Sequence, residues 1–288
     1  MKGRAEAGQQ LCMSFAGLRV LTLESRRAKE MATLIARHEG VPFVAPSVEE
    51  RPVEDDGTAL RFVEQLEAGA FEMVICMTAV SLAFLRDVLD VQIAPGRLAK
   101  ALSGTTVVSR GPKPIAVLRP LGVPVSVTIP EPNTWKEIVT AVAARAERRI
   151  AVLEYGRPNV EMNADLQRLG ATVTPVALYR WELPSDAGPL REAVRRIAAR
   201  ECDVVLFTSS VQLDHLLEVA RETGREEAVL RALARDTVIA SVGPVMTATL
   251  EARGLSAHIV PQHPKMWALV KETAERAPEV LASLKREV

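Results

Sequence analysis

The chain contains an internal repeat with a spacing of about 130 residues, and this repeat constrains the fold more than any single motif. The segment 107–123 (VVSRGPKPIAVLRPLGV) resembles the segment 239–255 (IASVGPVMTATLEARGL). From Ser109 to Trp135, 8 of 27 positions are identical at an offset of 132. Unrelated segments match at roughly one position in fifteen. Upstream, 19–27 and 149–157 correspond at an offset of 130. The repeat predicts two similar modules with a ligand in the cleft between them.

Composition restricts the class of protein. The 288 residues are 48% hydrophobic, enough for full cores, and Lys+Arg and Asp+Glu balance at 36 each, so no basic field indicates nucleic acid. No apolar run has membrane-spanning length, and the N-terminus lacks a secretory h-region. We therefore expect a cytoplasmic protein with a weakly ordered tail over residues 1–16. The scattered cysteines and histidines lack metal-ligand spacing, and no cofactor fingerprint occurs, so neither a metal nor a cofactor is expected.

Short apolar runs alternate with amphipathic stretches along most of the chain, which is typical of α/β folds with parallel sheets. Strands are expected at 18–23, 43–45, 73–77, 105–108, 125–129, 150–153, 172–176, 204–207, 238–242 and 257–260. Helices are expected at 26–39, 58–68, 79–90, 112–121, 134–147, 158–169, 188–201, 210–222, 226–235, 244–253 and 265–285. Because ligands bind parallel sheets at the carboxyl ends of the strands, the functional residues should follow the strands.

Two extended, proline-containing segments interrupt this alternation at equivalent places in the repeats. They are PSVEERPVEDDG (46–57) and VALYRWELPSDAGP (176–189). They could form a paired hinge between two lobes or two ordinary surface loops, and spacing alone does not choose between these alternatives.

The Gly-Pro turns are candidate anion sites. Gly111-Pro112 and Gly243-Pro244 each follow a strand and begin a helix, and the N–H groups at a helix start suit carboxylates. The alternative is that proline merely starts the helix well. Arg110 precedes the first turn, and Thr78 follows another strand, so both are further candidates for substrate binding.

Polar residues at other strand ends have similar alternatives. In Thr208-Ser209-Ser210 one hydroxyl should cap the next helix, and the others permit close ligand approach. Ser25 could cap the first helix, with Arg26 either directed at a ligand or simply solvated. Tyr179, one of two tyrosines, could donate a proton in a site without metal or serve as a packed linker aromatic.

With these residues in view, the chain from about 17 to 285 resembles the uroporphyrinogen-III synthase family. The resemblance rests on several short motifs in the right order: VLTLESRR, ALYRW, VVLFTSS, IASVGP with ATLEARGL, and IVPQHPKMWALV. It implies two flavodoxin-like α/β lobes joined by a two-stranded linker, with the chain crossing twice. Residues 17–48 with 184–288 would form domain 1, 53–177 domain 2, and 49–52 with 178–183 the linkers.

The implied reaction is the cyclisation of hydroxymethylbilane to uroporphyrinogen III, with inversion of ring D and loss of water, in tetrapyrrole biosynthesis. The partner implied is this linear tetrapyrrole, bound by a monomer without nucleic acid or membrane; transient contact with hydroxymethylbilane synthase is compatible with the resemblance. The competing hypothesis is a non-catalytic two-lobed protein that binds tetrapyrroles or other small molecules.

The resemblance also assigns residues. Tyr179 matches the family tyrosine proposed to assist departure of the hydroxyl group. The matched substrate-binding positions are Ser25, Arg26, Thr208, Ser209 and the turn Gly243-Pro244, to which the strand ends add Thr78, Arg110, Gly111 and Ser210. The chain departs from the family where Met246 replaces a common threonine, where MTAVSL (77–82) keeps one hydroxyl in a shortened turn, and where RGPKP (110–114) is unusually basic.

Overall fold

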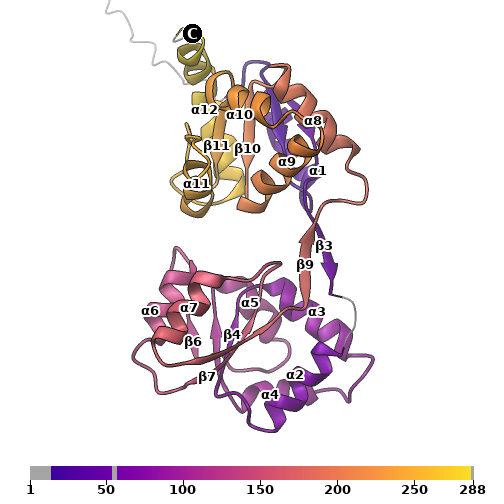
Figure 1. Ribbon diagram of the computed structural model, residues 1–288, viewed down its shortest axis with the longest axis vertical. Coiled ribbons are helices and arrows are strands. Elements are labelled where there is room, and N and C mark those ends of the chain that lie inside the picture. Colours follow the sequence, from indigo (N-terminus) through magenta and orange to yellow (C-terminus); the bar gives the residue numbers. More distant parts are fainter. Residues whose placement is uncertain (1–13, 54–56, 287–288) are drawn as a thin grey trace, which may run out of the picture. The chain divides into compact units, whose positions relative to one another are not determined.

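The computed structural model describes residues 14–53 and 57–286, which form two compact α/β units (Figure 1). Unit 1 consists of the chain up to Glu49 together with Leu183 onwards, and unit 2 is Glu50–Glu182. Unit 1 is therefore built from two segments that are separated by the whole of unit 2.

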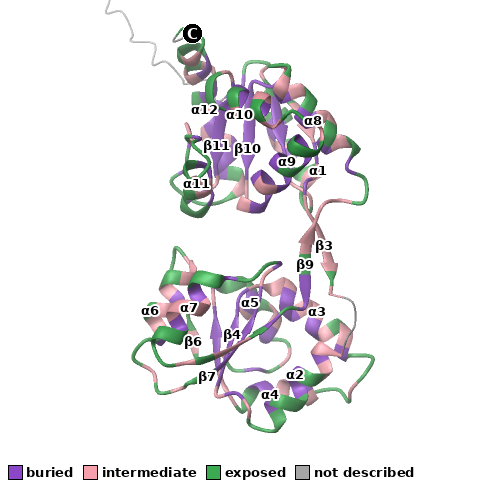
Figure 2. Cartoon of the chain, in the orientation of Figure 1, coloured by how far each residue is buried: buried purple, intermediate pink, exposed green. Residues whose placement is uncertain are grey.

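Unit 1 contains a four-stranded parallel sheet in the order β11-β10-β1-β2. Its strands are β1 (Arg19–Thr22), β2 (Val41–Val44), β10 (Val204–Phe207) and β11 (Val238–Ser241). Helices α8 (Gly188–Ala198), α9 (Ser210–Glu222), α10 (Glu226–Arg235) and α11 (Pro244–Glu251) pack on one face, and α1 (Ala28–Arg37) and α12 (Met266–Leu284) on the other. With helices on both faces, the central strand β10 and the edge strand β11 are buried throughout (Figure 2).

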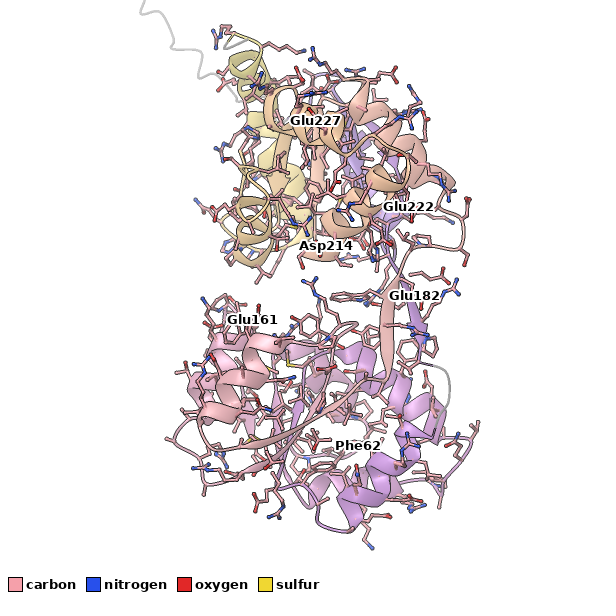
Figure 3. All side chains as sticks on the ribbon, in the orientation of Figure 1. Phe62, Glu161, Glu182, Asp214, Glu222 and Glu227 are labelled. Carbon is pink, nitrogen blue, oxygen red and sulfur yellow. The ribbon has the colours of Figure 1, made fainter. Side chains whose placement is uncertain are left out.

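Unit 2 contains a five-stranded parallel sheet in the order β6-β5-β4-β7-β8. The strands are β4 (Met73–Cys76), β5 (Thr106–Ser109), β6 (Val127–Thr128), β7 (Arg149–Leu153) and β8 (Thr172–Val176). One core lies between the sheet and α2 (Thr58–Glu67), α3 (Ala79–Leu89), α4 (Arg97–Ser103) and α5 (Pro112–Leu118). The other lies under α6 (Trp135–Val142) and α7 (Val160–Arg168). Phe62 of α2 lies in the first of these cores (Figure 3).

The two extended segments of the sequence pair with each other. They form a separate two-stranded sheet of β3 (Glu49–Pro52) and β9 (Tyr179–Glu182). The Val53 N–H extends this pairing by donating to the Leu178 carbonyl at 3.1 Å. Because the strands lie where the chain enters and leaves unit 2, the pairing holds the two ends of this unit together.

The repeat is visible in the sheets as an exchange of segments. The first βαβ segment of the first repeat, β1-α1-β2, pairs with β10 of the second repeat, and β7-α7-β8 pairs with β4 of the first. Numbered within the repeats, the sheet orders become 2-1-3-4 in unit 1 and 2-1-3-4-5 in unit 2. This is the flavodoxin-like order, and the predicted α/β class with parallel sheets is confirmed.

Several details differ from the sequence predictions. The strand expected at 257–260 is reduced to a single bridge between Ile259 and Ala240, because the Ile239 N–H donates to His258 Nδ1 instead of a strand carbonyl. The helix α4 was not expected; it begins after Gly96 and buries Leu98. The predicted tail was wrong at its end, because Phe15 is fully buried against α1 and its N–H donates to the His38 carbonyl; residues 1–13 of that tail lie outside the described residues.

The His258 contact predicts a pH dependence of stability. Burial lowers the pKa of the His258 imidazole from its ordinary value of 6.5, so the folded state favours the neutral ring that accepts from Ile239. This contribution is present above pH 6.5 and is lost as the pH falls towards the lowered value. The amide oxygen of the variant His258→Asn can accept the same hydrogen bond. From pH 7.5 to pH 5.5, the free energy of unfolding should therefore fall less in this variant than in the unmodified protein. Urea titrations at both pH values would measure this, and equal losses in both proteins would contradict it.

Candidate functional site

Thr78 and Tyr179 meet at the carboxyl edge of the unit 2 sheet. Thr78 follows β4 and caps α3, where its Oγ1 accepts from the Ser81 N–H at 3.1 Å. The same Oγ1 lies 3.3 Å from the Tyr179 Oη. Tyr179 is only 2% exposed, and its ring stacks on Phe84 with the centroids 5.5 Å apart. The phenol is therefore held by packing on one side and by a hydroxyl at its polar end.

The turn that follows β5 fixes the backbone of Arg110. The Ser109 hydroxyl donates to the Gly111 carbonyl at 2.8 Å. With the Asn133 amide oriented to satisfy its neighbours, its nitrogen donates to the carbonyls of Arg110 at 2.7 Å and Ile129 at 3.1 Å. A Cβ at position 111 would lie 2.6 Å from the end of the Asn133 amide, so any other residue there would displace this side chain. A buried serine and an asparagine thus set the position from which the Arg110 side chain starts.

The Arg110 guanidinium lies beside two tyrosines. Its Cζ is 5.2 Å from the centre of the Tyr155 ring, a cation–π distance. Burial lowers the pKa of the Arg110 guanidinium, and the nearby phenols of Tyr155 and Tyr179 act in the opposite direction. The structure therefore gathers Thr78, Arg110, Gly111 and Tyr179, all expected from the sequence, on one edge of unit 2.

Tyr155 and Trp181 were not among the site residues selected from the sequence. Tyr155 follows β7, and its ring meets the Trp181 ring of β9 edge-on, with centroids 5.5 Å apart. Gly156, the next residue after Tyr155, lies against the Trp181 ring: a Cβ added to it would be 2.3 Å from that ring. Its φ of +63° is in the left-handed region, which favours glycine. The dipeptide Tyr-Gly directly after a strand was the available signal, since glycine there permits both the turn and the close approach.

Substitution of Gly156 tests this packing. Gly156→Ala should reduce the free energy of unfolding by about 2–4 kcal/mol, from the left-handed backbone and from displacement of Trp181. Gly122→Ala is the matched control, because Gly122 has a similar φ of +73° with nothing near its missing Cβ. The control should lose only about 1–2 kcal/mol. Equal losses in urea denaturation would show that Trp181 does not constrain the turn.

Glu154 is a second residue that the sequence did not mark. It follows β7 at the topological switch point beside β4, and only 4% of it is exposed. Its Oε1 accepts from Asn163 Nδ2 of α7 at a long 3.5 Å, and burial raises the pKa of its carboxyl. The Oδ1 of Asn163 is buried without a hydrogen-bond partner among the described residues. This environment favours a neutral carboxyl group.

The raised pKa of Glu154 makes the stability of the folded protein depend on pH. The folded state prefers the protonated form, so its contribution is present at low pH and is lost as the pH rises through the raised value. Glu154→Gln should therefore gain stability relative to the unmodified protein between pH 5 and pH 8. Glu161→Gln provides the control, because Glu161 is an exposed acid in the first turn of α7, the helix that carries Asn163 (Figure 3). A Glu154→Gln stability difference that stays constant with pH would refute the neutral carboxyl.

In unit 1, the switch point lies between β1 and β10 and carries a hydrogen-bonded acid and hydroxyl. Thr208 Oγ1 donates to Glu24 Oε2 at 2.7 Å and accepts from Gln212 Nε2 at 2.8 Å. Gln212 Oε1 accepts from the N–H groups of Thr208 and Ser209, at 2.7 and 3.3 Å. Ser209 is the N-cap residue of α9 and Ser210 its first residue; both are partly exposed. One of the three hydroxyl residues therefore starts the helix, as expected.

Ser25 and Arg26 follow Glu24 in the chain, and neither of them caps α1. The Ser25 hydroxyl accepts from the Val48 N–H at 3.1 Å, and α1 begins only at Ala28 with Arg27 as its N-cap residue. The expectation that Ser25 caps the first helix is therefore wrong, because its hydroxyl satisfies the loop after β2 instead. Arg26 is exposed.

The Gly243-Pro244 turn repeats the geometry of the Gly111-Pro112 turn. The buried Ser241 hydroxyl donates to the Gly243 carbonyl at 3.1 Å, as Ser109 does to Gly111. Met246 is 2% exposed and belongs to the core, so it presents no group at the turn. Thr247 supplies the hydroxyl there: its Oγ1 donates towards the Gly243 carbonyl at 3.1 Å and lies 3.0 Å from Ser241 Oγ.

The two parallel sheets with exchanged βαβ segments define a two-domain α/β protein, and comparisons identify its family. The family model for uroporphyrinogen-III synthase HemD matches residues 29–271. The chain belongs to the uroporphyrinogen-III synthase family.

Individual proteins are similar to the chain at low identity. The uncharacterized protein YjjA of Bacillus subtilis is 24% identical over 266 residues, which cover 90% of this chain and 96% of that protein. The uroporphyrinogen III synthase of Thermus thermophilus has a similar structure, with a TM-score of 0.71 and 21% identity over 92% of this chain and 100% of that one. The enzyme of Helicobacter pylori matches with a TM-score of 0.51 and 14% identity, covering 93% and 99%. At these identities the structures show the fold alone.

No helix within residues 14–53 and 57–286 is long and apolar enough to span a membrane. Over the same ranges, no group of three His, Cys, Asp or Glu side chains is arranged to hold a metal ion.

Proposed function

We propose that the protein cyclises hydroxymethylbilane to uroporphyrinogen III with inversion of ring D and loss of water. The observation that carries the proposal is the buried Tyr179 phenol hydrogen-bonded to Thr78 at a sheet edge, in a chain of the uroporphyrinogen-III synthase family. A proton donor held in a fixed position is what departure of a hydroxyl group requires.

In this mechanism Tyr179 acts on the leaving group. Its Oη donates a proton as the hydroxyl of ring A departs as water, which leaves an azafulvene electrophile. Ring D attacks through its substituted carbon, and the spiro intermediate fragments and recloses. The ring carbon that closes the macrocycle then loses its proton, which returns to the Tyr179 oxygen, so the protein ends unchanged. Thr78 keeps the phenol oriented through the 3.3 Å contact.

Binding of the substrate is mainly a matter of conformation and charge. The substrate is a flexible chain with eight carboxylates, so holding its ends in position supplies much of the catalysis. Each unit presents suitable groups at its own carboxyl edge. Unit 2 has Arg110, and unit 1 has the hydroxyls of Thr208 and Ser209 and the turn at Gly243-Pro244.

The activity itself is tested with enzymatically generated hydroxymethylbilane. The products are oxidised, and the type I and type III isomers are separated by chromatography. We expect predominantly type III. Type I at the spontaneous rate, from folded protein, would refute the synthase and favour a protein that binds tetrapyrroles without converting them.

Tyr179→Phe tests the proton donor. Removal of the hydroxyl should lower kcat about 100-fold while KM changes little, because general acid catalysis contributes on this scale and the ring packing remains. Thr78→Val should lower kcat by a smaller factor, since it removes only the partner of the phenol. Thr140→Val removes an exposed hydroxyl from α6 in the same unit and should leave the kinetics unchanged. Unchanged turnover in Tyr179→Phe would remove the tyrosine from the mechanism.

A further inference from the structure

Arg110 is a cation that the described protein does not neutralise. Among residues 14–53 and 57–286, no carboxylate or carbonyl oxygen accepts a hydrogen bond from its guanidinium, whereas Arg19 and Arg97, for example, are each paired with a carboxylate. Its environment is instead aromatic, with the Tyr155 ring 5.2 Å from Cζ and the Tyr179 phenol also acting on it. Stacking on a tyrosine leaves the N–H groups at the edge of the guanidinium plane available.

This position costs free energy unless an anion is bound. The Arg110 side chain is partly buried, so its charge is partly removed from water, and this burial lowers the pKa of the guanidinium. A desolvated charge is compensated best by a planar carboxylate, which can accept two parallel N–H bonds from one guanidinium. The surrounding structure holds the arginine in place before any ligand binds, through Asn133 at its carbonyl and through the Tyr155–Trp181 contact at its side chain.

The internal repeat supplies a comparison within the same molecule. Unit 1 has the same Ser-x-Gly-Pro turn, with the same serine hydrogen bond to the glycine carbonyl. At the position of Arg110, however, unit 1 has Val242, and at the position of Tyr155 it has Ser25. The scaffold of the turn therefore does not need the arginine, because an equivalent turn forms with valine. The cation and its aromatic neighbour are additions to one unit only.

We propose that Arg110, stacked on Tyr155, binds one carboxylate of the tetrapyrrole through two parallel hydrogen bonds and thereby positions the substrate at Tyr179. This inference rests on the proposed synthase function, whose substrate carries the carboxylates. Arg110 is a binding and positioning residue in this scheme, and Trp181 supports it through the edge-on contact with Tyr155. The asymmetry of the repeat then gives the substrate one orientation on unit 2.

The test compares Arg110→Gln and Arg110→Lys with Arg119→Gln. Arg119 is an exposed arginine at the end of α5, so its replacement removes the same charge from the same helix region. Binding is measured with uroporphyrin III, a stable octacarboxylate, by quenching of tryptophan fluorescence. Arg110→Gln should raise its Kd roughly 10- to 100-fold, the scale of hydrogen bonds to a charged group. Arg110→Lys, which keeps the charge without the planar fork, should lie between; Arg119→Gln should match the unmodified protein.

Turnover and thermal unfolding separate this role from a structural one. KM for hydroxymethylbilane should rise more than kcat falls in Arg110→Gln, and the fraction of type I isomer should increase. Without ligand, the Tm of Arg110→Gln should equal or exceed that of the unmodified protein, because an unpaired desolvated charge has been removed. Uroporphyrin III should raise the Tm of the unmodified protein more than that of the variant.

The possible outcomes distinguish the two proposals. If the unmodified protein makes type III isomer and Arg110→Gln binds uroporphyrin III within twofold of it, the Arg110 inference is overturned while the synthase function stands. A ligand-free Tm that falls in Arg110→Gln, with unchanged binding, would assign the arginine a structural role instead. If the unmodified protein neither makes type III isomer nor binds uroporphyrin III, both proposals fail.

Discussion

The pairing of β1 with β10 is the contact on which unit 1 depends. It joins residues 184 positions apart, from Val20 opposite Val204 to Thr22 opposite Leu206. The start of the pairing is fixed by Asp203, which accepts from the Arg19 N–H at 2.8 Å and from its guanidinium at 2.9 Å. The Arg19 guanidinium lowers the pKa of the Asp203 carboxyl, which stays ionised. At the other end, this register brings Glu24 to Thr208, so the polar group of unit 1 exists only because the two segments meet.

Much of this architecture could be predicted from the sequence. The apolar runs mark nearly all strands, because a parallel strand buried on both faces must be apolar along its length. The strand predicted at 257–260 was wrong because the His258 side chain takes the place of a strand carbonyl as hydrogen-bond acceptor. The hydrophobic pattern of the sequence does not reveal such a replacement. The repeat also cannot say which βαβ segment pairs with which sheet. Both repeats carry the same pattern, so a cut near residue 148 fits the sequence as well as the exchange seen in the sheets.

The candidate site also contains residues that could be predicted from the sequence and residues that could not. Thr78 and Arg110 could be selected from the sequence because each follows a strand, where parallel sheets place their loops. Tyr179 was selected instead as one of two tyrosines, in an extended stretch that resembles the family's linker. Tyr155 and Trp181 could not be paired, since their contact depends on β9 returning past Gly156. Glu154 is the counterpart of Glu24 in the repeated segments 149–157 and 19–27, but nothing in the sequence marks it as a site residue. Its burial beside Asn163 is a property of the packed helix α7, which the repeat does not report.

Duplication alone gives a scaffold that treats both ends of a ligand alike, whereas the proposed reaction treats ring D differently from the other three rings. Under the proposed function, the carboxyl edges of the two units must therefore differ in chemistry. Their shared parts are structural: Ser109 and Ser241 each lock a Gly-Pro turn by the same hydrogen bond. Their differences are chemical. Unit 1 joins Glu24 to Thr208 by a hydrogen bond, whereas unit 2 buries the matching Glu154 and places Arg110 and two tyrosines at its edge. A repeat that keeps its turns and changes the charge beside them provides the asymmetry that such a reaction needs.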